Sequence, residues 1–247
     1  MANYARTPLA ECFAIQRRVL HALFLRELIT RFGRDNLGVL WLVGEPMLFT
    51  LGVTTLWSIA GLAHGGVGIP IVAFAVTGYS SVLMWRNSAT HCTHAIEVNR
   101  PLLFHRSVLA IDVCLAVIAL EVIGATGSFI FLGIFFTYIG WMPMPQDMAL
   151  VLGGWLMLAW FGSSLALLIG AACTFSDLVH RLWNPVSYIL FPMSGAAFMV
   201  EWMPKKLQDA VLYLPMVHGT ELLRHGYFGN VVKTHENVPY MAGCCLV

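Results

Sequence analysis

Long apolar runs constrain the fold of this chain more than any other feature. A helix needs about 20 apolar residues to cross a bilayer. The runs that approach or exceed this length cover residues 37–63, 69–85, 108–139, 148–175 and 182–200. A sixth run starts at Val238 and stops at Val247, so we expect that the given chain ends inside its sixth helix.

Composition supports the same fold class. The chain is 58% hydrophobic and 11% charged, and its mean hydropathy is +0.75, which excludes an ordinary soluble domain. We therefore expect an all-α integral membrane protein with six transmembrane helices. Residues 37–247 would form the transmembrane domain, with its last helix running from residue 238 to the end, and residues 1–36 would form a cytoplasmic segment before it.

The basic residues predict the orientation. Six arginines precede the first run, and four more follow the second and fourth runs. The segments 61–68 and 140–147 contain no Lys or Arg, and the remaining four basic residues follow the fifth run. Ten basic residues on one side and four on the other place the N-terminus in the cytoplasm by the positive-inside rule.

The N-terminal segment is basic and amphipathic just before the first span. On helical spacing one arc carries Phe24, Leu25, Leu28, Ile29 and Phe32. The opposite arc is polar, and the apolar stripe does not continue upstream, so we expect a bent or two-part interfacial helix on an anionic leaflet. We hypothesise that Arg26, Arg31 and Arg34 bind lipid headgroups or a substrate phosphate at the entrance of a pathway.

The segments between spans are unequal. The charged inside segment 86–107 contains His94–Phe104, which could form a short amphipathic helix that the Asn99-Arg100-Pro101 step ends or redirects. A plain connecting loop is the alternative. We expect two short outside helices within residues 201–237, Lys205–Leu214 and Val217–Phe228. Neither is long enough to span, so re-entrant or interfacial helices are expected there, with a solvated loop as the alternative.

Catalytic and nucleotide-binding motifs are absent from the sequence. There is no G-x-x-x-x-G-K-[ST] phosphate loop, no H-E-x-x-H and no G-x-S-x-G, so we expect no enzyme activity and no cofactor or metal site in this chain. His91 and His94 are three residues apart, which is more typical of packed or solvated side chains than of metal ligands. Asp112 and Glu121 lie in the third run, nine residues apart, and their phase predicts opposite helix faces. Glu121, nearer the middle, is the better candidate for a protein interior or pore.

Several segments together resemble the permease subunits of type-2 ABC exporters, in particular the capsule-polysaccharide branch. The resemblance extends over nearly the whole chain, and the unfinished sixth span is its one departure. The segments that carry it are residues 26–41 with Pro46, residues 175–185, 193–198 and 199–204, and residues 215–229.

The resemblance implies a transport subunit of the bacterial inner membrane. Such permeases form homodimers and dock two copies of a separate ATP-binding subunit, which would carry the ATP and Mg. The implied substrate is a lipid-linked acidic polysaccharide, with a periplasmic adaptor and an outer-membrane channel as further partners and no nucleic acid. The N-terminal basic helix and one inside segment would contact the ATPase. That segment contributes His94, Glu97, Arg100, Leu103, Phe104 and Arg106.

Aromatic and charged side chains are the candidates for the pathway, because rings stack on sugar faces and arginines pair with oxyanions. The candidates for the translocation pathway are Tyr79, Glu121, Trp155, Trp160 and Tyr188. The candidates on the outside helices are Trp202, Arg224 and Tyr227. Trp85 and Trp141, at the ends of spans, are expected to be interfacial belt residues instead.

Other functions remain open on the residues alone. An O-antigen or teichoic-acid exporter permease would share most of these patterns. An ion-coupled carrier would use Glu121 and Pro192, but it predicts inverted repeats, and the sequence shows no internal repeat. A membrane anchor that only recruits partners leaves the intramembrane acids unexplained.

Overall fold

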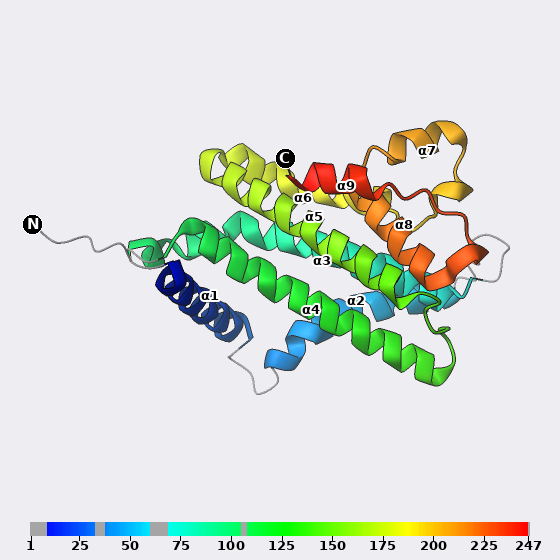
Figure 1. Ribbon diagram of the computed structural model, residues 1–247, viewed down its shortest axis with the longest axis horizontal. Coiled ribbons are helices and arrows are strands. Elements are labelled where there is room, and N and C mark those ends of the chain that lie inside the picture. The colour runs from blue at the N-terminus through cyan, green and yellow to red at the C-terminus, as the bar shows by residue number, and fades with distance from the viewer. Residues whose placement is uncertain (1–8, 33–37, 60–68, 105–107, 247) are drawn as a thin grey trace, which may run out of the picture.

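The computed structural model describes residues 9–32, 38–59, 69–104 and 108–246 of the chain. All regular structure in these residues is helical (Figure 1), so the expectation of an all-α chain is confirmed. Three helices among them are long and apolar enough to cross a membrane: α2 (Gly38–Ile59) over residues 40–57, α4 (Ala110–Ile139) and α5 (Met148–Phe175). Two further expected spans do not meet this criterion, because α3 (Ile71–Val98) is more polar and α6 (Asp177–Met193) is shorter.

The centre of the bundle is α3, which packs against both α4 and α5. Trp85 of α3 lies in this core with 0% of its surface exposed. Gly162 of α5 makes the close approach possible, because a Cβ there would lie 2.9 Å from Cα of Trp85. The expectation that Trp85 is an interfacial belt residue was therefore wrong, whereas Trp141 is 60% exposed at the end of α4.

The helix α3 continues well beyond the expected end of the second span. A loop was expected from residue 86, but the helix runs to Val98 and ends at Asn99. Polar residues do not interrupt it, because the Ser88 and Thr93 hydroxyls donate to carbonyls of their own helix. The expected break at Asn99-Arg100-Pro101 is confirmed, and the short 3-10 helix η1 (Arg100–Phe104) follows it.

The helix α6 is also displaced from the expected fifth span. It begins at Asp177, directly after the break at Ser176, and ends at Met193, so Pro185 lies inside it and Pro192 at its last turn. The chain then turns at Gly195, whose φ of 84° is the left-handed conformation that favours glycine. Pro192 was expected near the middle of the span and instead lies at the end of the helix, whereas Pro185, expected at its entry, lies near its middle.

Residues 201–237, which we call the outer segment after their expected side, contain the two short helices that were expected, while their insertion into a membrane stays a prediction. The first element is η2 (Val200–Trp202), and two short helices follow it, α7 (Lys205–Val211) and α8 (Pro215–Phe228). The break between the two helices lies near Pro215. The helix α8 ends at Gly229, which has a φ of 57°. Next come η3 (Gly229–Val231) and α9 (Val238–Leu246). The helix α8 is buried against α5, whereas α7 is mostly exposed.

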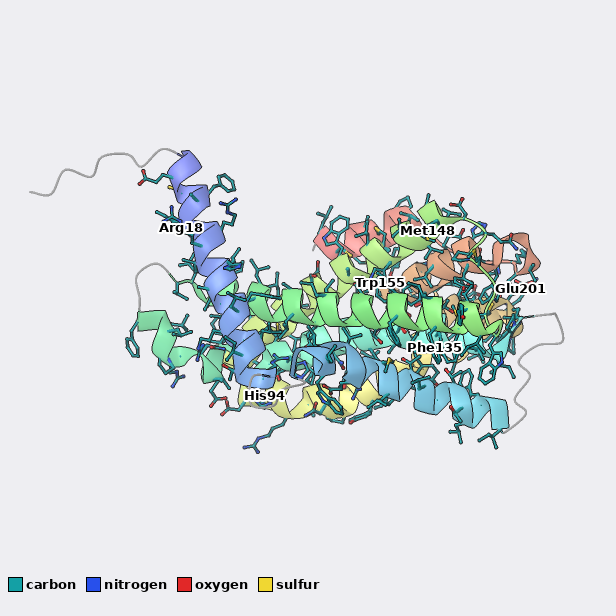
Figure 2. The ribbon with its side chains drawn as sticks, turned by 90° about the horizontal axis from the view of Figure 1, so that it is seen from below. Arg18, His94, Phe135, Met148, Trp155 and Glu201 are labelled. Carbon is teal, nitrogen blue, oxygen red and sulfur yellow. The ribbon has the colours of Figure 1, made fainter. Side chains whose placement is uncertain are left out.

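One N-terminal helix, α1 (Leu9–Phe32), replaces the bent or two-part helix that was expected. It crosses α4 at a steep angle near the start of α4 (Figure 2). In Figure 1, α1 lies toward one end of the bundle, and α7 and α8 lie toward the other. The two ends of the bundle therefore carry different groups of candidate residues.

Candidate functional site

Aromatic rings from α2, α3 and α6 pack into a connected set that we call the aromatic column. Tyr79 of α3 lies at its centre, with ring centroids 5.4 Å from Trp57, 5.5 Å from Phe191 and 6.1 Å from Phe49. Trp57 also stacks on Phe74 at 6.0 Å. Of the residues that the sequence suggested for a pathway, Tyr79 lies in this column.

The aromatic column extends at both ends. Toward the outer segment, Phe74 stacks on Trp202 at 5.3 Å. Toward the other end, Cζ of Arg86 lies 4.4 Å from the ring centroid of Tyr188 and 5.9 Å from that of Phe191. A cation over an aromatic face contributes about 0.5–2 kcal/mol. Arg86 therefore connects the ring of Tyr188, a second suggested pathway residue, to Phe191 of the aromatic column.

Sequence reasoning missed Arg86 as a site residue, because it placed Arg86 at the start of a loop. In the structure Arg86 is near the midpoint of α3, and its Nε is buried without a hydrogen-bond partner. A usable signal was present: Arg86 follows Tyr79 by seven residues, a spacing that places both on one helix face.

The structure does not bring Trp155 and Trp160 into the column. Trp155 is buried between α5 and α4, where its Nε1 donates to Thr126 Oγ1 at 2.9 Å and its ring stacks on Phe129 at 4.4 Å. Trp160 is 40% exposed on α5. The pathway role suggested for these two tryptophans stays a prediction.

A polar cluster ties α1 to the bundle. Arg31 Nε donates to Glu27 at 2.7 Å, and Arg31 Nη1 donates to Glu121 Oε1 of α4 at 2.5 Å. His91 Nδ1 of α3 lies 2.8 Å from the same Glu121 oxygen. Glu121 therefore connects three helices.

Further polar contacts extend the attachment of α1. Gln16 donates to Asp112, and Arg26 donates to Asn99. Asp112 therefore meets α1, as Glu121 does, but through a different residue of that helix, and the opposite phase of the two acids on α4 stays a prediction. The two acids contact separate positions along α1, Gln16 for Asp112 and Arg31 for Glu121. Arg34, the third suggested entrance residue, lies outside the described residues.

Removing the negative charge of Glu121 tests this attachment. We expect Glu121→Gln to loosen α1, because Arg31 loses a partly buried charge-assisted hydrogen bond worth about 1.5–3 kcal/mol. Hydrogen exchange should accelerate over residues 9–32 and not over α5. Glu45→Gln, at an exposed carboxylate of α2, is the matched control. Unchanged protection of α1 in Glu121→Gln would contradict the attachment.

The suggested coupling residues lie at the end of the bundle near α1 (Figure 2, His94). The His94 ring packs edge-on against His180 of α6 at 4.2 Å between centroids. Phe104 is 88% exposed, and Leu103 is partly buried against the core. Glu97 and Arg100 are also exposed, and Arg106 lies outside the described residues. An apolar side chain beside exposed charges is suited to docking a partner.

At the other end, Arg224 of α8 is completely buried. Its Nη1 donates to the carbonyls of Gly195 at 2.6 Å and Phe198 at 2.7 Å, and its Nη2 donates to that of Ala196 at 2.9 Å. Its Cζ lies 3.9 Å from the ring centroid of Phe74. Arg224 therefore holds the turn after α6 against the aromatic column.

Buried Glu221, which sequence reasoning missed, supports the same region. It accepts from the backbone N–H of Val200 at 3.4 Å and of His235 at 3.3 Å. The Glu-x-x-Arg spacing, which places Glu221 and Arg224 on one helix face, was the available signal. On the surface nearby, the His235 ring lies 2.6 Å from the Glu201 carboxyl, and this hydrogen bond lowers the pKa of Glu201.

Tyr227, the third residue suggested for the outer helices, is buried on α8, and its hydroxyl donates to the carbonyl of Pro143 at 2.5 Å. In the ranges that the structure describes, no group of three or more His, Cys, Asp or Glu side chains is placed to hold a metal ion. The polar groups of Glu221, Arg224 and Tyr227 are therefore engaged with the protein itself.

A bundle with three helices long and apolar enough to cross a membrane is typical of an integral membrane protein. Residues 18–228 match the family described as ABC-2 type transporter, and the chain belongs to that family. The resemblance to type-2 ABC exporters is thereby confirmed.

The chain is also similar to named export and transport proteins over most of their length. The chain is 40% identical to the capsule polysaccharide export inner-membrane protein CtrC of Neisseria meningitidis serogroup A, over 100% of this chain and 93% of that protein. It is 39% identical to the capsule polysaccharide export inner-membrane protein BexB of Haemophilus influenzae, over 96% and 89%. Identity to the polysialic acid transport protein KpsM of Escherichia coli is 27%, over 95% and 91%.

Proposed function

We propose that this chain is the permease subunit of an ATP-driven exporter of lipid-linked acidic capsular polysaccharide in a bacterial inner membrane. The 40% identity to a capsule polysaccharide export protein over the whole chain carries this proposal. An O-antigen or teichoic-acid substrate is the alternative within the same class. The named relatives favour capsule, because each is described as a capsule export or polysialic acid transport protein.

The aromatic column is the part of the bundle best suited to a glycan. It combines ring faces, which stack on sugars, with the cation of Arg86, which attracts acidic groups. The adjoining surfaces of α2 and α6 expose large apolar side chains, including Leu48, Phe49, Tyr188 and Ile189. We propose that a second copy of the chain faces these helices, so that two columns enclose the pathway.

ATP hydrolysis would be supplied by two copies of a separate subunit, which would hold the ATP and Mg. The sequence contains no phosphate loop of its own. The exposed charges and Phe104 beyond α3 are the proposed docking surface, on the cytoplasmic side. The outer segment, including the exposed α7, would meet a periplasmic adaptor leading to an outer-membrane channel.

The function as a whole is tested in a capsule-producing strain that lacks this permease. Restoring the unaltered chain should return polysaccharide to the cell surface and should allow an ATP-binding subunit to co-purify with the chain. Full surface polysaccharide without the chain would overturn the proposed function. Purification without any ATP-binding partner would overturn its assignment to an ABC exporter.

The docking surface is tested by Phe104→Asp. We expect the ATP-binding subunit to dissociate during purification, because the substitution places a charge in the apolar centre of the contact. The chain itself should still insert and fold, since Phe104 is 88% exposed. Leu207→Asp, at a 53% exposed leucine of α7, is the matched control and should retain the ATPase. An intact complex in Phe104→Asp would place the docking surface elsewhere.

A further inference from the structure

Arg86 differs from the other buried or partly buried arginines of this structure in what surrounds its charge. Arg31 is paired with two carboxylates, and Arg224 donates to backbone carbonyls of the turn after α6. Arg86 contacts the ring faces of Tyr188 and Phe191, and its Nε is buried without a hydrogen-bond partner. Among the described residues, no carboxylate forms an ion pair with it.

The surroundings of Arg86 offset only part of the free-energy cost of burying its charge. Removing a guanidinium from water costs free energy, and an aromatic face returns only part of that cost. A guanidinium also presents its N–H groups as a planar fork, which matches the two oxygens of a carboxylate or phosphate. The arrangement around Arg86 therefore has the geometry of an anion site whose anion arrives from outside the chain.

We propose that Arg86 and Tyr188 form an oxyanion-binding site that takes a carboxylate or phosphate group of the acidic glycan as it passes along the aromatic column. This inference rests on the proposed export function and names the residues that recognise the charge of the substrate. Tyr188 is 66% exposed on α6, so the ring beneath the guanidinium lies at the surface of the chain, where a substrate can reach it.

The source of the oxyanion follows from the neighbouring rings. Phe191 contacts both Arg86 and Tyr79, with a centroid separation of 5.5 Å to Tyr79. The cation is therefore continuous with the aromatic column. A sugar acid uses both features, because its ring stacks while its carboxylate pairs with the arginine. A phospholipid headgroup would use the arginine alone, and we therefore assign the site to the glycan.

The test measures binding to the purified complex in nanodiscs of phosphatidylcholine. The probes are a fluorescently labelled oligomer of sialic acid and a neutral dextran oligomer of equal length. We expect Arg86→Gln to weaken binding of the acidic oligomer roughly ten- to hundredfold, the loss expected for one charged hydrogen-bonding partner. Binding of dextran should be unchanged. Arg86→Lys should retain part of the affinity, since it keeps the charge and loses the planar fork.

Arg181→Gln is the matched control, because it removes an exposed arginine from α6. Equal binding of the acidic oligomer by the unaltered protein and Arg86→Gln would overturn the proposal, as would equal binding of both oligomers by the unaltered protein. Phosphatidylglycerol retained during purification from cells is measured by mass spectrometry. Its loss in Arg86→Gln, with oligomer binding unchanged, would identify a lipid headgroup and overturn the assignment to the glycan.

Different results would contradict the proposed function and the proposed oxyanion site. If the proposed function is wrong, the unaltered protein neither restores surface polysaccharide nor brings down an ATP-binding subunit. If only the site is wrong, both of those results are obtained and Arg86→Gln exports as well as the unaltered protein. If the site is correct, Arg86→Gln keeps the ATP-binding subunit and its thermal stability but exports much less polysaccharide.

Discussion

Replacing Arg224 by methionine is expected to abolish accumulation of the folded protein in the membrane. The substitution leaves the buried carbonyls of Gly195 and Ala196 and the partly buried carbonyl of Phe198 without their donor. It also removes the cation that lies near the buried carboxyl of Glu221. Removing one partner of a buried ion pair costs about 3–5 kcal/mol of stability. This is a large share of the roughly 5–15 kcal/mol by which a typical domain is stable.

The measurement is the yield of monodisperse protein after detergent extraction, followed by fluorescence-detected size exclusion. Lys206→Met is the matched control, because Lys206 is an exposed cation on α7 and its loss should leave the yield unchanged. Adding Glu221→Gln to Arg224→Met should recover part of the yield, since the two buried charges are then removed together. A normal yield from Arg224→Met would show that the turn after α6 is held by other contacts.

Gly154→Ala is expected to destabilise the protein strongly, although alanine is the better helix former. A Cβ at Gly154 of α5 would lie 2.6 Å from the backbone N of Leu223 on α8, and backbone cannot move aside as a side chain does. The two helices must separate, and such overpacking costs about 1–3 kcal/mol. The midpoint of thermal unfolding in detergent, followed by tryptophan fluorescence, should therefore fall.

The neighbouring residue supplies the control. A Cβ at Gly153 would meet nothing within 4 Å, so Gly153→Ala should be neutral or should stabilise the helix by about 0.5–1 kcal/mol. The opposite signs of two identical substitutions, one residue apart, would show that α8 is packed tightly against α5 and is not a loosely associated surface helix. Equal unfolding midpoints for the two variants would contradict that packing.

Features that depend on neighbours along the chain were predictable. The apolar runs 108–139 and 148–175 correspond closely to α4 (Ala110–Ile139) and α5 (Met148–Phe175), because the length and hydropathy of a run are local properties. The break near Pro215 and the end of α8 at Gly229 follow equally from local backbone preferences. The family resemblance was also available from the residues alone, and the sequence had singled out Tyr79 and Tyr188 of the aromatic column, whose pathway role stays a prediction.

Burial and pairing were decided by residues far apart in the chain. Arg31 meets Glu121 across 90 residues, and Arg224 approaches the Phe74 carbonyl across 150. A local spacing such as Glu-x-x-Arg shows that two side chains share a helix face, but it does not show whether the arginine is buried or faces lipid headgroups or water. The polar residues after Trp85 predicted a loop, but α3 continued through them because neighbouring helices pack against it and its hydroxyls bond within the helix. That continuation places Arg86 beside α6, because the end of a helix depends on tertiary packing as well as on local polarity.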